Sequence, residues 1–286
     1  MYNIVIPACA RAGWGWDLVK KFMHNCRKRF GQNFLLDNSV IEQIIHVINP
    51  KAKDHLIEIG PGLGAITKYL LPLISRLDAI ELDRELIPKL IAKFNTEDNF
   101  AIHQGDILKF DLNSLIPPTS MVRVVGNLPY NISTPLLFYL LSYTNNIIDM
   151  HFMLQKEVAL RLAANPGSKD YGRLSIMIQY HCKVNFLFEV KPTSFRPMPK
   201  VNSAFVRLTP LENAKKTPLR NFNIFQEIIS LAFNQRRKTI QNSLKSKFVK
   251  EDFVNLNINP VLRPEQLSIE HYIALSNYLA LRNGPN

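Results

Sequence analysis

Apolar positions between residues 38 and 208 follow two alternating periods. Short runs of β-branched, aromatic and other apolar residues alternate with longer segments in which apolar residues recur every three or four positions. The first pattern is typical of buried strands and the second of amphipathic helices. Strands are predicted at His55–Ile59, Leu77–Leu82, Phe100–Gln104, Val122–Gly126, Met150–Leu154, Phe186–Val190 and Ala204–Leu208. Helices are predicted at 38–48, 64–74, 84–94, 134–142 and 155–164.

This alternation indicates βαβ units, and therefore an α/β fold with a mostly parallel sheet of seven strands. The pattern changes after Thr209-Pro210, where a polar link at 212–218 leads into segments of helical period at 223–248, 250–256 and 264–282. We expect a main domain at 27–210 and a small all-helical C-terminal domain at 211–286. The length of 286 residues accommodates two such units.

Residues 1–26 differ from the rest of the chain. They contain Gly13-Trp14-Gly15-Trp16 but lack the parts of a signal peptide. Met23 stands just before Arg27-Lys28-Arg29-Phe30. We interpret 1–26 as an extension, and one hypothesis is that translation begins at Met23. An intact mass that includes Met1 would contradict this hypothesis.

Charge and cysteine content narrow the class of protein. The chain has 35 Lys and Arg against 23 Asp and Glu, a net charge of +12, which favours a polyanionic partner but also fits a basic solvated surface. The same two interpretations stay open for the basic stripe at 234–238 and 245–247.

Three scattered cysteines predict neither a disulfide framework nor a metal site, and indicate a reducing, cytosolic compartment. No apolar run approaches the roughly 20 residues of a membrane helix.

A glycine-rich turn follows the first predicted strand. Glycines at 60, 62 and 64 permit a tight turn and close approach of a ligand, and the helix expected from Ala65 offers free N–H groups to an anion. Glu81, 21 residues after Gly60, has the spacing of an acid that binds ribose hydroxyls. Asp106 follows the third strand and is a candidate acceptor for an exocyclic adenine amine. The G-x-G-x-G spacing disfavours an NAD-dependent dehydrogenase, which uses G-x-G-x-x-G.

Asn127-Leu128-Pro129-Tyr130 stands at the end of the fourth predicted strand, where open α/β sheets bind ligands. The Asn127 side-chain oxygen and the Leu128 carbonyl can accept the two hydrogens of an adenine N6 amine and aim its lone pair at a sulfonium methyl group. Tyr130 can stack on the base and stabilise the developing positive charge. Phe195, in a proline-rich loop, is the candidate for the opposite face of an extruded base. The structural alternatives are a strand-ending turn with a packing tyrosine and a Phe195 that anchors its loop in the core.

Taken together, these stretches resemble the KsgA-type family of small-subunit rRNA adenine dimethyltransferases. The resemblance runs from about Arg27 to Leu281 and rests on an ordered series of motifs: Lys28–Leu35, Glu58–Gly64, Ile80–Asp83, Gly126–Pro135, Met153–Glu157, Tyr171–Ser175, Phe195–Ser203 and Arg263–Ser268. It implies a Rossmann-like class I methyltransferase fold and S-adenosylmethionine as cofactor. By this resemblance the cofactor contacts are Asn33, Leu35, Gly60, Glu81, Asp106 and Asn127, and the catalytic residues are Asn127, Leu128, Tyr130 and Phe195.

The resemblance also implies the substrate, two adjacent adenosines in the 3′-terminal hairpin of 16S rRNA, each dimethylated on the assembling 30S subunit. A monomeric, cytoplasmic enzyme without bound metal is expected. The related erythromycin-resistance methyltransferases share Asn-Leu-Pro-Tyr but act on large-subunit rRNA, and Tyr171–Ser175 and Arg263–Ser268 favour the small-subunit family. A mitochondrial transcription-factor relative with dispensable catalysis is the third alternative; retained Asn127, Tyr130 and Phe195 argue against it.

Overall fold

The computed structural model describes residues 32–117, 119–212, 217–235 and 237–284. The predicted extension at 1–26 and the hypothetical start at Met23 lie outside the described residues. Within the described residues, none of the helices is long and apolar enough to cross a membrane.

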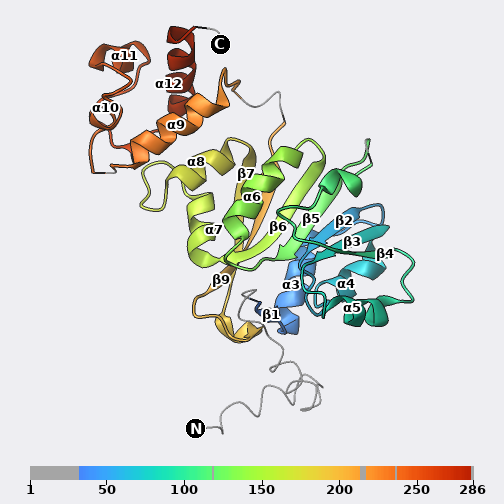
Figure 1. Cartoon of the computed structure of the whole chain (residues 1–286). Coiled ribbons are helices and arrows are strands. Elements are labelled where there is room, and N and C mark those ends of the chain that lie inside the picture. Colours follow the sequence, from blue (N-terminus) through green and yellow to red (C-terminus); the bar gives the residue numbers. More distant parts are fainter. Residues whose placement is uncertain (1–31, 118, 213–216, 236, 285–286) are drawn as a thin grey trace, which may run out of the picture.

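A seven-stranded sheet forms the centre of the molecule, in the order β4-β3-β2-β5-β6-β9-β7 (Figure 1). Strand β9 runs antiparallel to β6 and β7, and the other neighbours in the sheet are parallel. The predicted α/β fold with a mostly parallel seven-stranded sheet is therefore confirmed. Its strands are β2 (His55–Ile59), β3 (Arg76–Glu81), β4 (Phe100–Gln104), β5 (Val122–Asn127), β6 (Ile147–Gln155), β7 (Cys182–Val190) and β9 (Ser203–Pro210).

Helices cover both faces of this sheet. One apolar core joins Ile57 and Ile59 of β2 to helices α6 (Ser133–Leu140), α7 (Lys156–Ala163) and α8 (Arg173–Gln179). A second core joins Leu56 of the same strand to α3 (Asn38–Ile48), α4 (Thr67–Leu70) and α5 (Ile87–Phe94). Because successive strand side chains point to opposite faces, neighbouring residues of β2 serve different cores. Short 3₁₀ turns are η2 (Leu71–Leu73), η3 (Leu112–Ser114), η4 (Leu141–Tyr143), η5 (Pro192–Ser194) and η7 (Pro264–Gln266).

The C-terminal helices gather beside α8, at the end of the molecule away from β4 (Figure 1). They are α9 (Phe222–Phe233), α10 (Ile240–Ser243), α11 (Lys250–Asn255) and α12 (Ile269–Arg282). Their core also includes Tyr171, Ile176 and Met177, which precede or belong to α8. The helical character of this part agrees with the sequence pattern, while the domain boundary near residue 210 stays a prediction.

The structure differs from the predicted elements at several places. Two strands of two residues each, β1 (Phe34–Leu35) and β8 (Phe195–Arg196), pair antiparallel as a separate ribbon, and neither was predicted. Helix α8 was also missed. The helix expected at 64–74 is only α4 followed by η2, because Pro72 cannot continue an α-helix. The segment expected at 223–248 is broken, since α10 begins anew with the Thr239 side chain as its N-cap.

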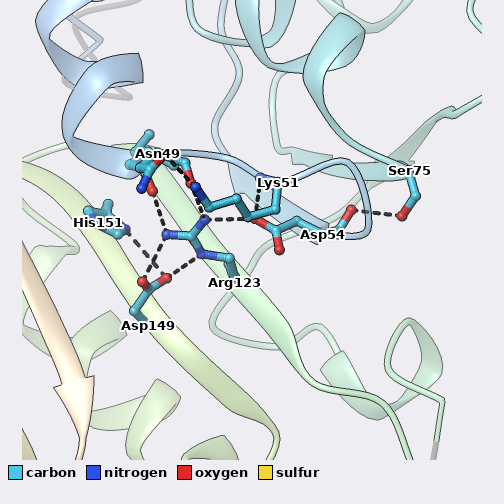
Figure 2. A network of polar contacts seen from close by, with 8 residues as sticks. Asn49, Lys51, Asp54, Ser75, Arg123, Asp149 and His151 are labelled. Carbon is cyan, nitrogen blue, oxygen red and sulfur yellow. Dashed lines mark hydrogen bonds and ion pairs between the residues drawn. The ribbon is translucent and has the colours of Figure 1, made fainter.

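A buried arginine joins α3 to the sheet at the amino ends of its strands (Figure 2). Arg123 of β5 donates from Nε and Nη2 to both oxygens of Asp149, at 2.8 and 2.9 Å. It also donates to Asp54 Oδ2 at 2.7 Å and to the carbonyl oxygen of Ile48, the last residue of α3, at 2.6 Å. Burial lowers the pKa of the neighbouring His151 to about 4, so this imidazole is neutral. Helix α3 ends at Asn49, which is left-handed, and the Arg123 guanidinium binds the carbonyl of the last helical residue to the sheet.

Candidate active site

A cavity opens at the carboxyl ends of β2, β3 and β5, the edge of the sheet at which α/β folds bind ligands. Seven of the predicted site residues meet in its wall: Asn33, Leu35, Gly60, Glu81, Asn127, Leu128 and Tyr130. The fold therefore brings together residues that are up to 97 positions apart in the sequence, from Asn33 to Tyr130. Asp106 and Phe195 are not in this wall.

The glycine-rich turn forms one side of the cavity. Gly60, Gly62 and Gly64 have φ values of 66, 60 and 72°, in the left-handed region that other residues rarely adopt. A Cβ atom at Gly64 would come within 2.6 Å of the Phe94 ring, whereas the space beside Gly60 is open. The helix after the turn begins at Thr67 and not at Ala65 as expected. The turn itself, not a helix end, therefore presents the backbone to a ligand.

Glu81 is buried at the end of β3 and holds the turn in place. Its Oε2 accepts from the Gly62 N–H at 3.2 Å, and its Oε1 accepts from the Asp83 N–H at 2.9 Å. Burial raises the pKa of this carboxyl although both backbone donors act to lower it. Each carboxylate oxygen has a further lone pair, so Glu81 can brace the turn and still accept a ligand hydroxyl.

Glu58 is a cavity residue that sequence reasoning did not select. It points from β2 into the wall with only 2% of its surface exposed, and its Oε2 accepts from Thr67 Oγ1 at 2.6 Å. Burial raises the pKa of Glu58 to about 7, against the opposing effect of the Thr67 bond. The signal in the sequence was an acid inside an otherwise apolar strand, His55–Ile59.

Asn127 is held by the chain that precedes β1. Its Nδ2 donates to the Asn33 carbonyl oxygen at 2.8 Å, which orients the amide group. The Oδ1 atom of the same amide is an acceptor, and Asn127 is one of the residues that line the cavity. The next residue, Leu128, is tied to β6 through its N–H, which donates to the Met153 carbonyl at 3.3 Å. Hydrogen bonds to the chain before β1 and to β6 therefore fix the positions of Asn127 and Leu128.

Tyr130 is half-buried at the same wall, and both its ends are tethered. Its hydroxyl lies 2.7 Å from Ser203 Oγ, at the start of β9, and its carbonyl accepts from Ser133 Oγ at 3.0 Å. Burial raises the pKa of the Tyr130 hydroxyl, so the ring stays neutral. A neutral aromatic ring, tethered at both ends, therefore lines the same cavity as the Asn127 amide.

The two remaining predicted residues lie behind the wall. Phe195 is 1% exposed, pairs with Leu35 across the β1–β8 ribbon, and packs in the core under α3. It was expected in a proline-rich loop against one face of the base, with an anchor in the core as the alternative, and the structure buries its ring. Asp106 follows β4, where its side chain accepts from the Leu108 N–H at 3.1 Å. Its neighbour Gly105 donates to the Glu81 carbonyl at 3.0 Å, so Asp106 lies next to Glu81 but not in the wall.

Gln32 is a second cavity residue missed by sequence reasoning. Its Nε2 lies 3.4 Å from Asp83 Oδ2, which links the start of the described chain to the end of β3. The signal was its place directly before Asn33. Within the described residues, no group of His, Cys, Asp and Glu could hold a metal ion. The site therefore offers oriented amide, carboxyl and aromatic groups.

Comparisons with known proteins agree with this geometry. The ribosomal RNA adenine dimethylase family matches residues 23–281. The ribosomal RNA small subunit methyltransferase A of Pseudomonas aeruginosa is 54% identical over 259 residues, covering 91% of this chain and 96% of the relative. The protein of that name from a Marinomonas species is 49% identical over 267 residues, covering 93% and 100%.

Solved structures share the fold. A dimethyladenosine transferase from Plasmodium falciparum has a TM-score of 0.72 and 28% identity, covering 85% of this chain and 95% of that one. The 23S rRNA methyltransferase ErmE has a TM-score of 0.68 over 86% and 99% of the chains, and at 24% identity it supports the fold alone. These matches confirm the expected Rossmann-like class I methyltransferase fold. This chain belongs to the ribosomal RNA adenine dimethylase family and is a methyltransferase.

Proposed function

We propose that this enzyme transfers methyl groups from S-adenosylmethionine to the N6 atoms of two adjacent adenosines in the 3′-terminal hairpin of 16S rRNA. The observation that supports the proposal is the Asn127 amide in the cavity wall, whose Nδ2 donates to the Asn33 carbonyl and whose Oδ1 is the acceptor of the same group. The names of the relatives point to the small subunit. The assembling 30S particle, the monomeric state and a cytoplasmic location stay predictions.

The cavity suits the proposed cofactor. Gly60 leaves room at the turn, and Glu81 has lone pairs for the two ribose hydroxyls. Glu58 supplies a carboxyl in the same wall whose ionised form complements a cation. S-adenosylmethionine, when bound, supplies a methyl group on a positively charged sulfonium. We assign its contacts to Asn33, Leu35, Gly60, Glu81 and Asn127, with Asp106 supporting Glu81 from the next strand.

The chemistry requires acceptors and orientation, not a base. The lone pair of adenine N6 is delocalised into the ring, which makes this nitrogen a weak nucleophile. Asn127 Oδ1 and the Leu128 carbonyl would accept its two hydrogens and direct the lone pair toward the methyl group. Orientation of this kind contributes up to roughly 7 to 11 kcal/mol in favourable systems. The proton leaves to solvent after transfer, because an amide cannot act as a base and the product cation is acidic.

Aromatic contacts complete the proposed pocket. The Tyr130 ring, fixed by Ser203 and Ser133, would stack on the base and stabilise the positive charge that develops on N6. Stacking by Phe195 would require an open ring face, and the structure buries that ring. We therefore propose that Phe195 supports the pocket from behind Leu35, its partner in the β1–β8 ribbon. For the second methyl transfer, one N6 hydrogen remains to be held by the acceptor pair.

Replacing Asn127 by alanine tests this mechanism. Asn127→Ala should lower single-turnover methyl transfer at least about 100-fold, because one acceptor and the amide orientation are lost together. Binding of RNA should change less than about threefold. Asn113→Ala, an exposed asparagine away from the cavity, is the matched control. The mechanism would be wrong if RNA affinity fell as far as turnover while the bound complex reacted at the normal rate.

A further inference from the structure

The segment 197–202 joins the two sides of the cavity. It begins after Arg196, which pairs with Phe34 in the β1–β8 ribbon, and Phe34 lines the cavity on the side of the glycine turn. It ends at Ser203, whose hydroxyl lies 2.7 Å from the Tyr130 hydroxyl on the side of the base. Six residues therefore bridge from the cofactor wall to the base wall.

This bridging segment exposes apolar side chains. Met198 is 58% exposed and Val201 is 45% exposed, while Pro199 between them is buried. A single exposed apolar residue on a surface has no special meaning. Here the two stand on one short segment whose two ends contact residues of the cavity wall, with the exposed Lys200 between them. An apolar side chain next to a cation fits a nucleic acid, which offers base faces and phosphates together.

The segment is also held rigidly. Pro197 and Pro199 flank Met198 and fix their own φ angles. At the far end, the Asn202 carbonyl accepts from the Lys156 N–H at 2.9 Å, and the Asn202 amide donates to Glu189. Glu189 in turn pairs with the Lys156 ammonium at 2.6 Å. The backbone that carries Met198 therefore needs little further ordering when the side chain meets a partner.

We propose that Met198 is an RNA wedge: its side chain enters the base stack at the place that the target adenine leaves when it moves into the cavity. The inference rests on the proposed function. Taking a base out of a stack costs free energy, and proteins that insert Met, Leu, Ile, Phe or Pro between bases offset part of that cost. Methionine suits the position because its flexible, polarizable thioether adapts to an irregular gap. Lys200 would contact the phosphate beside the gap.

The wedge is tested by a fluorescent base at the target position. The full chain is added in excess to the 3′-terminal hairpin RNA in which 2-aminopurine replaces one target adenine, because this base brightens when it is unstacked. Wild-type protein should raise the fluorescence several-fold. Met198→Ala should lose most of that rise at saturation, and Met198→Leu, which also has a wedge-forming side chain, should keep it. An equal rise with the alanine variant, or no rise with the wild type, overturns the proposal.

Methyl transfer to undermethylated small subunits gives the second readout. Met198→Ala should lower kcat/KM by about tenfold or more, because part of the cost of unstacking is no longer offset. The matched control is Met121→Ala, since Met121 is 46% exposed but precedes β5 at the end opposite Asn127. On a single-stranded oligonucleotide with abasic sites on both sides of the adenine, the alanine variant and the wild type should react alike. A tenfold loss of kcat/KM on this oligonucleotide too would show that Met198 shapes the cavity itself, and it would overturn the wedge.

These outcomes separate the wedge from the enzyme's function. A wild-type protein that methylates neither substrate contradicts the proposed function, whatever the Met198 variants do. A wild-type protein that methylates both, with no effect of Met198→Ala on either, contradicts the wedge alone.

Discussion

Individual side chains at this site each make a structural contact, and each has a chemical task in the proposed mechanism. Asn127 uses its amide N–H₂ to bind the Asn33 carbonyl, and the proposal assigns its Oδ1 to the substrate amine. Glu81 binds two backbone N–H groups and retains lone pairs, which the proposal assigns to ribose hydroxyls. Because these protein contacts are present without a ligand, the orientation of both groups is set in advance.

Glu58 makes stability depend on pH. Its folded-state pKa of about 7 exceeds its usual value of 4.5, so the folded protein binds the proton more tightly than the unfolded chain. The stabilisation is present below pH 4.5 and is lost as pH rises toward 7, by about 3 kcal/mol over the interval. Glu58→Gln keeps an acceptor for Thr67 and does not ionise. Urea unfolding without cofactor should therefore show the variant to be more stable than the wild type at pH 8.

The comparison at pH 8 is made against the same pair at pH 5, where the stability advantage of the variant should be smaller by about 2 kcal/mol. Parallel stability curves for the two proteins between pH 5 and pH 8 would show that Glu58 does not titrate in this way.

At the scale of elements, α3 connects the site to the opposite edge of the sheet. At its first turn, Asp37 caps the helix and accepts from Ser194 Oγ at 2.9 Å, next to the β1–β8 ribbon. At its last turn, the Ile48 carbonyl is bound by Arg123. The cavity wall at Asn33 and Leu35 is therefore attached to a helix that is fixed at both ends.

Removing the Arg123 guanidinium should release the far end of α3. Arg123→Met fills a similar volume but leaves the half-buried carboxylates of Asp149 and Asp54 without their guanidinium partner. Breaking such a pair costs about 3 to 5 kcal/mol, because desolvated charges remain uncompensated. Urea unfolding measures the loss, and Arg220→Met, at an exposed arginine, should change stability by less than about 0.5 kcal/mol. A loss below about 1 kcal/mol for Arg123→Met would contradict the role of this network.

Sequence periodicity predicted the seven strands of the sheet. Strands that are covered on both faces require continuous apolar runs, and such runs are visible in a single sequence. The periodicity missed the β1–β8 ribbon, since two residues are too few to carry a period. It also missed α8, whose seven residues pack against both the sheet and the C-terminal helices. An element buried on both sides has no polar stripe, and without one the helical period does not stand out.

Seven of the nine predicted site residues line the cavity. The cavity residues on strand ends followed from the rule that parallel strands end at one edge, and Asn33 and Leu35 followed only from family resemblance. The sequence left two alternatives for Phe195, stacking on the base or anchoring its loop in the core, because the choice depends on pairing with Leu35, 160 residues earlier. Glu58 and Gln32 were missed because their roles depend on which side of a strand or turn faces the cavity.

At the scale of the whole molecule, the helical C-terminal part carries exposed cations away from the cavity. Arg237 and Lys238 follow α9 and are exposed. Arg236, which belongs to the same basic stripe, lies outside the described residues. Helix α9, which these cations follow, lies beside α8 at the end of the molecule away from β4 (Figure 1). We expect them to contact RNA phosphates and to leave the cofactor site unaffected.

Reversing these two charges tests that expectation. Arg237→Glu with Lys238→Glu should weaken binding to small subunits by about tenfold or more at 0.1 M salt, and the difference should shrink as salt rises. Cofactor affinity, measured by calorimetry, should not change. Lys53→Glu with Lys183→Glu makes the same change in net charge at exposed positions elsewhere and should bind almost normally. If both double substitutions weaken binding equally, the effect comes from the net charge of the protein and not from the position of Arg237 and Lys238.

The central claim is that the enzyme dimethylates adenine N6 in small-subunit rRNA, and one mapping experiment tests it most directly. The protein and S-adenosylmethionine are incubated with undermethylated small subunits, naked small-subunit rRNA and large subunits, and the methylated adenines are mapped. The account predicts N6,N6-dimethyladenosine at two adjacent positions in the 3′-terminal hairpin of the small-subunit rRNA. Methylation confined to large subunits, or absent from all three, would contradict it.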